Sequence, residues 1–190
     1  MPTENTSLTV EWNKNQGVVL FADLISFFPV MAKMSSKDLG PLINNLYGLW
    51  GSEVRKQRGE VIAYIGDSIL AVFRKDGCSG MDPEWCATLT AFHLVKGTKK
   101  IRPEVDLNVS IHSGEFIEGA WEEQGRKMVT ILGNTINHAA VMVGVKSKGI
   151  FATRPIVDVL GPRVKHEKYS FRFPGTSEDE TIYHLLSLSL

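Results

Sequence analysis

The sequence predicts an α+β fold in which helices cover one face of a sheet. Residues 17–23 form a continuous apolar run, which is typical of a central, buried strand. Between Leu39 and Val54, apolar residues recur at the spacing of one helix face. The predicted strands and helices intermix without the strict alternation of βαβ units, which favours the α+β class.

The first half of the chain carries clear boundary signals. We expect a loop over residues 24–33 and then a helix that begins at the N-cap signal of residues 35–38. Gly59 marks the end of this helix. Apolar residues over 61–73 then predict two short strands, which reverse tightly at residues 66–67 as a hairpin.

The second half alternates between the same two kinds of pattern. Residues 105–112 alternate like a strand, and we expect residues 116–121 to pair back on it through a turn at Gly114. The other expected elements are helices over 84–97, 136–145 and 155–160, and strands over 128–132, 150–153, 169–173 and 181–186.

Length and composition bound the organisation of the chain. With 190 residues, 43% of them apolar, we expect a single domain at residues 17–190, preceded by a polar arm or added edge element at residues 1–16. The N-terminus has no signal-peptide pattern, and no apolar run reaches the ~18 residues of a membrane span. Lys plus Arg and Asp plus Glu each number 21, so no bulk charge attracts nucleic acid or an acidic membrane. Cys78 and Cys86 fit a reducing cytosol as buried or idle thiols, and we expect a cytoplasmic protein.

Two stretches each place one aspartate at the end or turn of an apolar strand. Asp23 ends the run of residues 18–23, and Asp67 lies in the turn of residues 64–68. Either aspartate alone is more simply a turn or capping residue. A carboxylate in such a place is costly unless a positive charge meets it, so a convergent pair suggests a divalent metal site. Metal with a phosphate-rich substrate is the chemistry that such a site serves.

Four motifs, in order along the chain, resemble the catalytic domain of class III nucleotidyl cyclases. They lie at residues 21–27, 65–73, 109–114 and 131–140. The first is similar to the family's strand ending Phe-x-Asp-Ile-x-Gly-Phe, and the second to its Ile-Gly-Asp turn followed by Ala-x-Phe. The third is similar to Val-Gly-Ile-His-Thr-Gly, and the fourth to Ile-Gly-Asp-Thr-Val-Asn-x-Ala-Ala. Any one motif alone would be weak, but together they imply a ferredoxin-like α+β palm with a mixed, mostly antiparallel sheet.

The resemblance also implies roles for individual residues. In the family two aspartates, here Asp23 and Asp67, hold two Mg²⁺ or Mn²⁺ ions with help from a backbone carbonyl, here that of Leu24. The ribose 3′-hydroxyl attacks the α-phosphorus, and pyrophosphate leaves. Asn137 matches the asparagine that positions the ribose and the transition state. Backbone N–H groups after the first aspartate would hold the β- and γ-phosphates, here those of Ile25, Ser26, Phe27 and Phe28.

Some positions around the substrate depart from the family pattern. Ala63 replaces a base-reading Lys or Glu, and its side chain cannot hydrogen-bond a purine edge. Thr130 stands where adenylyl enzymes usually carry Asp or Thr. Val141 replaces an Arg that stabilises the transition state, a contact that can supply ~3 kcal/mol or more. Tyr64 lies near the Asp67 turn, where it either reaches the nucleotide or packs on the opposite face of the sheet.

Retained aspartates with altered purine-reading positions resemble the stand-alone pyrimidine cyclases of the bacterial Pycsar anti-phage system. This resemblance implies UTP as the substrate and a cyclic nucleotide that activates a separate effector. It also implies a symmetric head-to-tail homodimer, in which one chain supplies the aspartates and the other supplies Asn137. CTP and a purine triphosphate remain alternative substrates. A non-catalytic, nucleotide-binding regulatory domain is the alternative from another class, because Val141 removes a catalytic charge.

Overall fold

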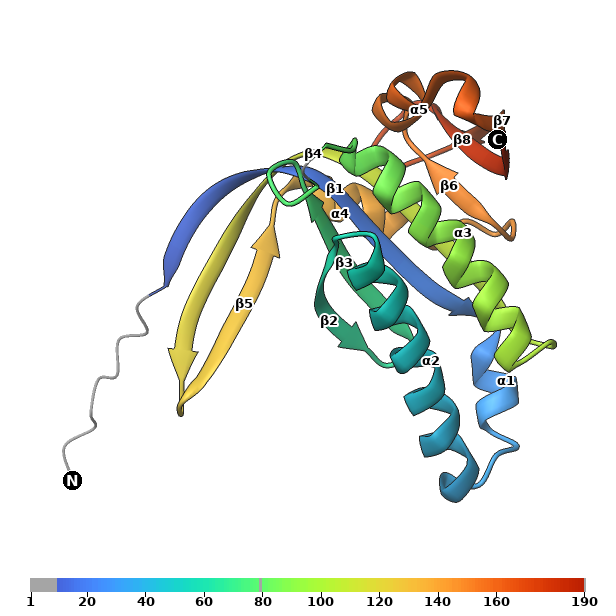
Figure 1. Cartoon of the computed structure of the whole chain (residues 1–190). Helices are drawn as coiled ribbons and strands as arrows, with labels where there is room; N and C mark the ends of the chain where they lie inside the picture. The colour runs from blue at the N-terminus through green and yellow to red at the C-terminus, as the bar shows by residue number, and fades with distance from the viewer. Residues whose placement is uncertain (1–9, 79, 190) are drawn as a thin grey trace.

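The computed structural model describes residues 10–78 and 80–189, which form one sheet flanked by helices (Figure 1). In chain order the elements are β1 (Glu11–Ile25), α1 (Phe27–Met31), α2 (Ser36–Lys56), β2 (Glu60–Ile65), β3 (Ser68–Arg74), α3 (Pro83–Ile101), β4 (Asp106–Glu123), β5 (Arg126–Leu132), α4 (Asn134–Met142), β6 (Ile150–Ala152), α5 (Arg154–Leu160), the short 3₁₀ turn η1 (Gly161–Arg163), β7 (Val164–Phe171) and β8 (Glu180–Leu188). Most expected elements are therefore present, with boundaries that differ by a few residues.

The strands form one eight-stranded sheet with the order β2-β3-β1-β4-β6-β8-β7, and β5 pairs with β4 outside this path. Every pair is antiparallel except β4 with β6. The chain order β1-α2-β2-β3-α3-β4, combined with the spatial order β2-β3-β1-β4, is the ferredoxin-like arrangement. The expected α+β class and palm architecture are confirmed.

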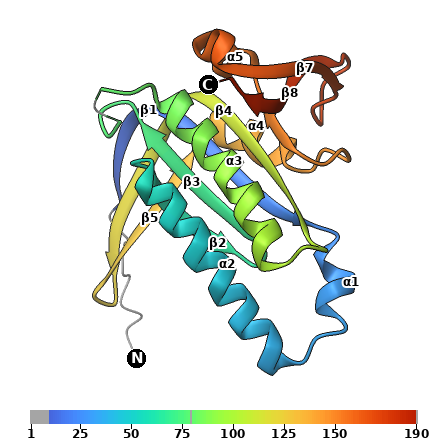
Figure 2. The same cartoon turned by 45° about the vertical axis from the view of Figure 1, so that its right-hand side comes forward.

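Helices lie on both faces of the central strands. α2 and α3 pack on one face and α4 lies on the other (Figures 1 and 2). Side chains of β1 alternate between them: Val18 and Leu20 join the core under α2 and α3, while Val19 and Phe21 pack with Ala139 of α4. The expectation of helices on one face therefore holds for α2 and α3 and misses α4. A strand covered on both faces is apolar at every position, which explains the continuous run in the sequence.

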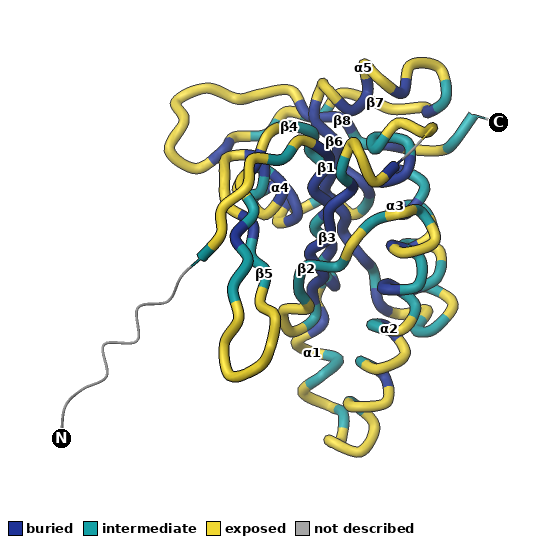
Figure 3. Tube along the Cα trace, turned by 60° about the vertical axis from the view of Figure 1, so that its left-hand side comes forward, coloured by how far each residue is buried: buried dark blue, intermediate teal, exposed yellow. Residues whose placement is uncertain are grey.

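β1 begins at Glu11, inside the segment 1–16 expected to be a polar arm or added edge element. Residues 11–16 already pair with residues 115–120 of β4, while residues 1–9 lie outside the described part of the chain. This end of β1, together with residues 115–123 of β4 and with β5, extends from the body as a largely exposed ribbon, here named the β-arm (Figure 3). No long helix among the described residues covers the ribbon, and its first residues, 11–16, are mostly polar although their backbone is a strand.

β4 is one unbroken strand, and the expected turn at Gly114 is wrong. Gly114 lies opposite Gly17 within the β1–β4 pair. A Cβ at Gly114 would come within 2.6 Å of the hydroxyl oxygen of Thr135 on α4. Glycine at this position allows the close approach of α4 and does not reverse the chain.

The core between the sheet and its two long helices centres on Trp50, which is fully buried. Its indole Nε1 donates a 3.0 Å hydrogen bond to Thr98 Oγ1 on α3. This contact joins α2 to α3, and α2 is the helix that packs beside the β2–β3 hairpin.

The structure also bears on the two cysteines and on membrane-spanning helices. Cys78 and Cys86 are both free and buried, as expected for idle thiols. Across residues 10–78 and 80–189, no helix combines the length and hydropathy that a bilayer crossing requires.

Candidate active site

Asp23 is held at the end of β1 by the strand beside it. In the antiparallel β1–β3 pair it lies opposite Ser68, whose hydroxyl donates to Asp23 Oδ1. The side chain is half-buried on the α4 face of the sheet, the face that also carries Val19 and Phe21. Burial raises the pKa of the Asp23 carboxyl, the Ser68 hydrogen bond opposes this, and the charge of Asp67 adds to the rise.

Asp67 reaches the same place from the turn of the β2–β3 hairpin. Gly66, just before it, has a φ of 60°, a left-handed conformation that glycine adopts without steric cost. The backbone N–H of Leu24 donates to the backbone carbonyl of Asp67 at 3.3 Å, so the turn is tied to the end of β1. The pairing of β1 with β3 thus brings the two predicted aspartates together.

The two carboxylates fit a hard divalent cation. None of the ion pairs among the described residues uses Asp23 or Asp67, so no basic side chain compensates this negative charge. In the same part of the chain no group of three or more His, Cys, Asp or Glu side chains gathers, so the donors here are two carboxylates and backbone oxygen. Oxygen donors of this kind suit Mg²⁺ or Mn²⁺, and Leu24, whose carbonyl is expected to help, is bonded through its N–H to the Asp67 turn.

The predicted phosphate-binding segment follows directly. Ile25 is the last residue of β1, and Ser26 turns the chain with a φ of 54° into the single turn of α1. The side chain of Phe27 is buried, whereas that of Phe28 is 74% exposed. Both phenylalanines line a mainly apolar cavity of about 490 Å³ that reaches Asp67. The segment thus follows Asp23 along the chain and shares a cavity with Asp67, and its phosphate-binding role stays a prediction.

Ala63 and Tyr64 occupy opposite faces of β2. Ala63 lies opposite Leu70, and so it shares the face of Asp23 and Ser68. Tyr64 lies opposite Ile69 and stacks on Tyr47 of α2, with ring centroids 4.2 Å apart. Of the two alternatives expected for Tyr64, the structure shows packing on the face opposite to Ala63 and Asp23, against α2.

Three other predicted positions have no hydrogen bond to the aspartates among the described residues. Asn137 is exposed on α4, and no hydrogen bond given for the described residues joins it to Asp23 or Asp67. Thr130 lies opposite Gly119 in the β-arm. Val141 packs against the apolar cluster of Met142 and Phe151, among others.

Sequence reasoning missed two residues that support the aspartates. Ser68 is adjacent to Asp67 in the chain, but its contact with Asp23 depends on the register of β1 and β3. Tyr47 gives no local signal, because it reads as one more apolar position of α2. Its hydroxyl donates to the carbonyl of Gly66, and burial, followed by the charges of Asp67 and Tyr64, raises its pKa.

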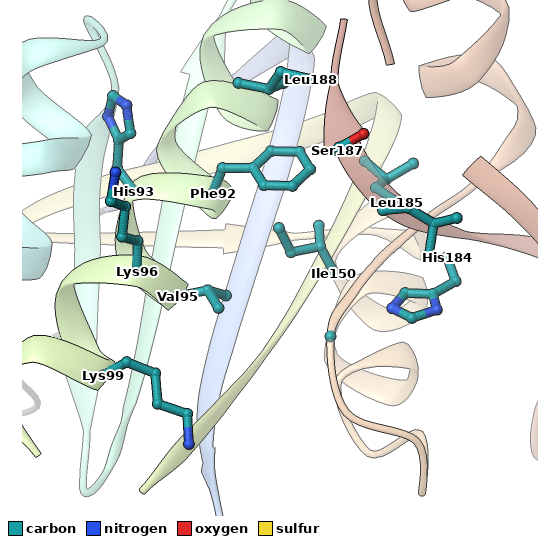
Figure 4. Close-up of a pocket in the computed structure, with 12 residues that line it drawn as sticks. Phe92, His93, Val95, Lys96, Lys99, Ile150, His184, Leu185, Ser187 and Leu188 are labelled. Carbon is teal, nitrogen blue, oxygen red and sulfur yellow. The ribbon is translucent and has the colours of Figure 1, made fainter. Parts of the chain in front are cut away.

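Another cavity lies apart from this site. It has a volume of about 630 Å³ and opens between α3 and β8 (Figure 4). Phe92, Val95, Ile150 and Leu185 line it, with Lys99 at one end (Figure 4). None of the predicted site residues contributes to it.

Comparisons with known proteins agree with this geometry. The model of the family described as adenylate and guanylate cyclase catalytic domain matches residues 10–180. The photoactivated adenylate cyclase subunit alpha of Euglena gracilis is 25% identical over 158 residues, which are 78% of this chain and 15% of that protein. The chain spans between 15% and 23% of the length of the curated relatives it matches.

Solved structures share the fold at low sequence identity. The adenylyl cyclase CyaB from P. aeruginosa superposes with a TM-score of 0.85 at 17% identity, over 94% of this chain and 97% of that one. The guanylate cyclase domain of RhGC from Catenaria anguillulae superposes with a TM-score of 0.80 at 17% identity, over 93% of this chain and 100% of that one. The family model covers nearly the whole chain and includes both aspartates. The chain therefore belongs to the adenylate and guanylate cyclase catalytic-domain family.

Proposed function

We propose that this chain is a metal-dependent nucleotidyl cyclase, which converts a nucleoside triphosphate to its 3′,5′-cyclic monophosphate and pyrophosphate. The observation that carries the proposal is the convergence of Asp23 and Asp67 without a basic partner among the described residues. Uncompensated charge at a partly buried site costs stability and is useful only if a cation binds there.

Asp23 and Asp67 would hold two divalent ions, Mg²⁺ or Mn²⁺, with the carbonyl of Leu24. When bound, such ions lower the pKa of the attacking hydroxyl and neutralise charge on the triphosphate. The residues of this chain contribute orientation. Ser68 fixes one oxygen of Asp23, so the other lone pairs of the carboxylate stay available for a cation. The N–H groups of residues 25–28 would hold the terminal phosphates beside this pair.

The residues at positions 63 and 130 support a pyrimidine substrate, with UTP first and CTP second. Ala63 presents only a methyl group on the face of β2 that carries the aspartates, so no charged side chain reads a purine edge there. Thr130 likewise offers a hydroxyl and no charge. Discrimination would then come from pocket size and from hydrogen bonds to the smaller ring, which can reject the wrong base strongly. A purine triphosphate is the rival substrate.

The expected roles of Asn137 and Thr130 support a homodimer with shared sites. Among the described residues no hydrogen bond joins either of them to the aspartates of their own chain, and Asn137 is exposed on α4. In a two-fold dimer the same two surfaces meet twice, which would give two equivalent sites. The exposed apolar side chains of the β-arm, Trp12, Ile117, Met128 and Leu132, supply a surface of the kind that dimers bury.

The cyclic nucleotide would act as a cytoplasmic second messenger. Resemblance to pyrimidine cyclases of anti-phage defence supports a separate effector protein that responds to the product. One observation favours the non-catalytic alternative: Val141 packs in an apolar cluster and supplies no charge to the transition state. In that case the chain would bind a nucleotide and regulate a partner.

A substrate panel separates these functions. The purified chain is incubated with Mn²⁺ and each of ATP, GTP, CTP and UTP, and products are identified by mass spectrometry. We expect cyclic UMP as the main product. Conversion of ATP or GTP at least as fast as UTP and CTP would contradict the pyrimidine assignment. Nucleotide binding without any cyclic product would support the regulatory alternative.

Ala63→Lys tests how the base is selected. If the pocket excludes purines by size, this variant does not become an efficient adenylyl cyclase, because lysine adds a hydrogen-bond donor without adding room. Efficient cyclic AMP formation by Ala63→Lys would show that the missing side chain alone sets the base preference.

A further inference from the structure

Two tyrosines lie behind the turn that carries Asp67. Tyr47 projects from α2, and its hydroxyl donates to the backbone carbonyl of Gly66. The ring of Tyr64 stacks on it at a centroid distance of 4.2 Å and an interplanar angle of 22°. The hydroxyl of Tyr64 donates to the backbone carbonyl of Tyr47 at 3.1 Å. Helix α2 is thus joined directly to the peptide that precedes Asp67.

The turn is held from both sides. The carbonyl of Gly66, before Asp67, accepts from Tyr47, and the carbonyl of Asp67 itself accepts from the N–H of Leu24 at 3.3 Å. The first donor belongs to α2 and the second to β1. A two-residue hairpin turn is otherwise anchored only by its own strands. These two bonds fix the Asp67 backbone relative to β1, and therefore relative to Asp23.

The ring of Tyr47 is itself restrained. It packs between Tyr64 on one side and the aromatic ring of Trp50 on its own helix, 6.1 Å away between centroids. Trp50 is fully buried and bonded to α3, so α2 is a rigid support. A hydroxyl carried by such a support can define the position of a turn, whereas a hydroxyl on a mobile side chain cannot.

We propose that Tyr47 is a positioning residue for the metal-binding carboxylate of Asp67, with Tyr64 holding the ring of Tyr47 in place. This proposal rests on the proposed metal site and deepens it. Residues that orient metal ligands without touching the metal typically change metal affinity by 10–100-fold when they are removed. Tyr47 acts one peptide away from the ligand, so the lower part of that range applies.

Tyr47→Phe tests the proposal, because phenylalanine keeps the stacked ring and removes only the hydroxyl. Mn²⁺ binding is followed by loss of the free-ion electron paramagnetic resonance signal, with 3′-deoxy-UTP present so that no cyclisation occurs. We expect the Mn²⁺ concentration at half-saturation to rise by about 10-fold. The thermal midpoint of the metal-free protein should stay within about two degrees of wild type.

Two further variants complete the comparison. Tyr64→Phe keeps the stack and loses the bond to the Tyr47 backbone, so we expect a smaller shift in the same direction. Tyr169→Phe removes a hydroxyl from a ring that packs on Phe151 at a different cluster, and it should bind Mn²⁺ like wild type.

The outcomes separate the positioning role from the proposed reaction. Unchanged Mn²⁺ affinity in Tyr47→Phe would overturn the proposal, whatever its thermal midpoint. Weakened Mn²⁺ binding in Tyr47→Phe supports it even if the wild-type chain forms no cyclic nucleotide, a result that would refute the proposed reaction alone. Absence of any Mn²⁺ binding by the wild-type chain would overturn both the positioning role and the metal site.

Discussion

The negative charge of Asp23 destabilises the folded chain, because no positive side chain among the described residues pairs with it. Its half-buried carboxylate accepts one hydrogen bond, from Ser68, and shares the site with the negative charge of Asp67. Burial and this neighbour raise its pKa, so the charged form is disfavoured relative to the unfolded chain. Stability is lost here in the absence of metal, at the point where the proposed reaction needs a cation ligand.

Asp23→Asn should separate stability from activity. Asparagine can still accept the Ser68 hydrogen bond but carries no charge. In the wild type, a folded-state pKa above the ordinary value of 3.8 means that stability falls as the pH rises from that value through the raised pKa. In EDTA at pH 7 the variant should therefore melt at a higher temperature than wild type, and the difference should shrink towards pH 4.

The same variant should lose cyclase activity. Removal of one charged metal ligand costs several kcal/mol of transition-state stabilisation, so we expect turnover to fall by about 10³-fold or more. Asp67→Ala should show the same loss with the fold intact by circular dichroism. Near-wild-type turnover in either variant would contradict the two-metal assignment, and a lower melting temperature for metal-free Asp23→Asn at pH 7 would contradict the electrostatic account.

His112 gives the protein a separate dependence on acid. Its Nδ1 lies 2.7 Å from Thr153 Oγ1, and burial, with a smaller effect of His138, lowers its pKa to about 4. Between the ordinary pKa of 6.5 and about 4, the unfolded chain takes up a proton that the folded chain does not. The stability of the folded state is therefore full above pH 6.5 and falls as the pH drops towards 4.

Urea unfolding of wild type and of His112→Gln measures how much His112 contributes to the loss of stability in acid. Between pH 7.5 and pH 4, we expect the free energy of unfolding to fall by up to about 3 kcal/mol more in wild type than in the variant. His166→Gln, at an exposed position of β7, serves as the matched control and should lose stability like wild type. Equal acid dependence in wild type and His112→Gln would contradict the assignment.

At the scale of elements, the rigidity of α2 matters for the site. The helix carries Trp50 into the core and bonds to α3 through Thr98, and it carries Tyr47 to the Asp67 turn on the same side of the sheet. The indole N–H is buried, so its single acceptor cannot be replaced by bulk water. Loss of this bond should loosen the helix pair that supports the site.

Thr98→Val tests this bond with little change in volume. We expect a loss of about 1–3 kcal/mol, because the Trp50 N–H is left buried without an acceptor. That loss lowers the melting temperature by roughly 2–4 °C per kcal/mol for a chain of this size. Thr98→Ser keeps a hydroxyl, so its free energy of unfolding should fall clearly less than that of Thr98→Val. A Thr98→Val variant as stable as wild type would show that the N–H finds another partner.

At the scale of the whole molecule, the proposed site depends on residues from several elements of the chain. The aspartates lie at the end of β1 and in the β2–β3 turn, whereas Asn137 is exposed on α4 and Thr130 lies in the β-arm. The exposed apolar side chains of the β-arm are consistent with a surface that a second copy covers. Assembly is thus the step at which the proposed site would become complete.

Mixing two inactive variants tests this assembly. In a mixed dimer of Asp67→Ala and Asn137→Ala, one of the two shared sites has both residues intact. Random exchange of equal amounts gives mixed dimers in half of the population, so activity should recover to about a quarter of wild type. Exchange is checked by mass spectrometry of differently tagged chains. No recovery after demonstrated exchange would count against a shared site.

The sequence by itself determined the local elements and the carboxylate pair. Periodicity located the helices at α2 and α3 and the hairpin at residues 60–74, because these patterns report which side of each element is apolar. The aspartates could be identified from the sequence because one ends an apolar strand and the other lies in the turn between two apolar strands. Family motifs added the roles of Leu24 and Asn137, which no periodicity reveals.

Only the tertiary structure decided which faces and neighbours these residues have. Gly114 allows α4 to approach β4 instead of turning the chain, and Tyr64 stacks on Tyr47 of α2, which decides between the two faces left open for it. The contacts of Ser68 with Asp23 and of Tyr47 with Gly66 span 45 and 19 residues. Local sequence carries no information on such pairs, because strand register and helix packing are set by the whole core. The site's support is therefore a property of the assembled sheet and helices.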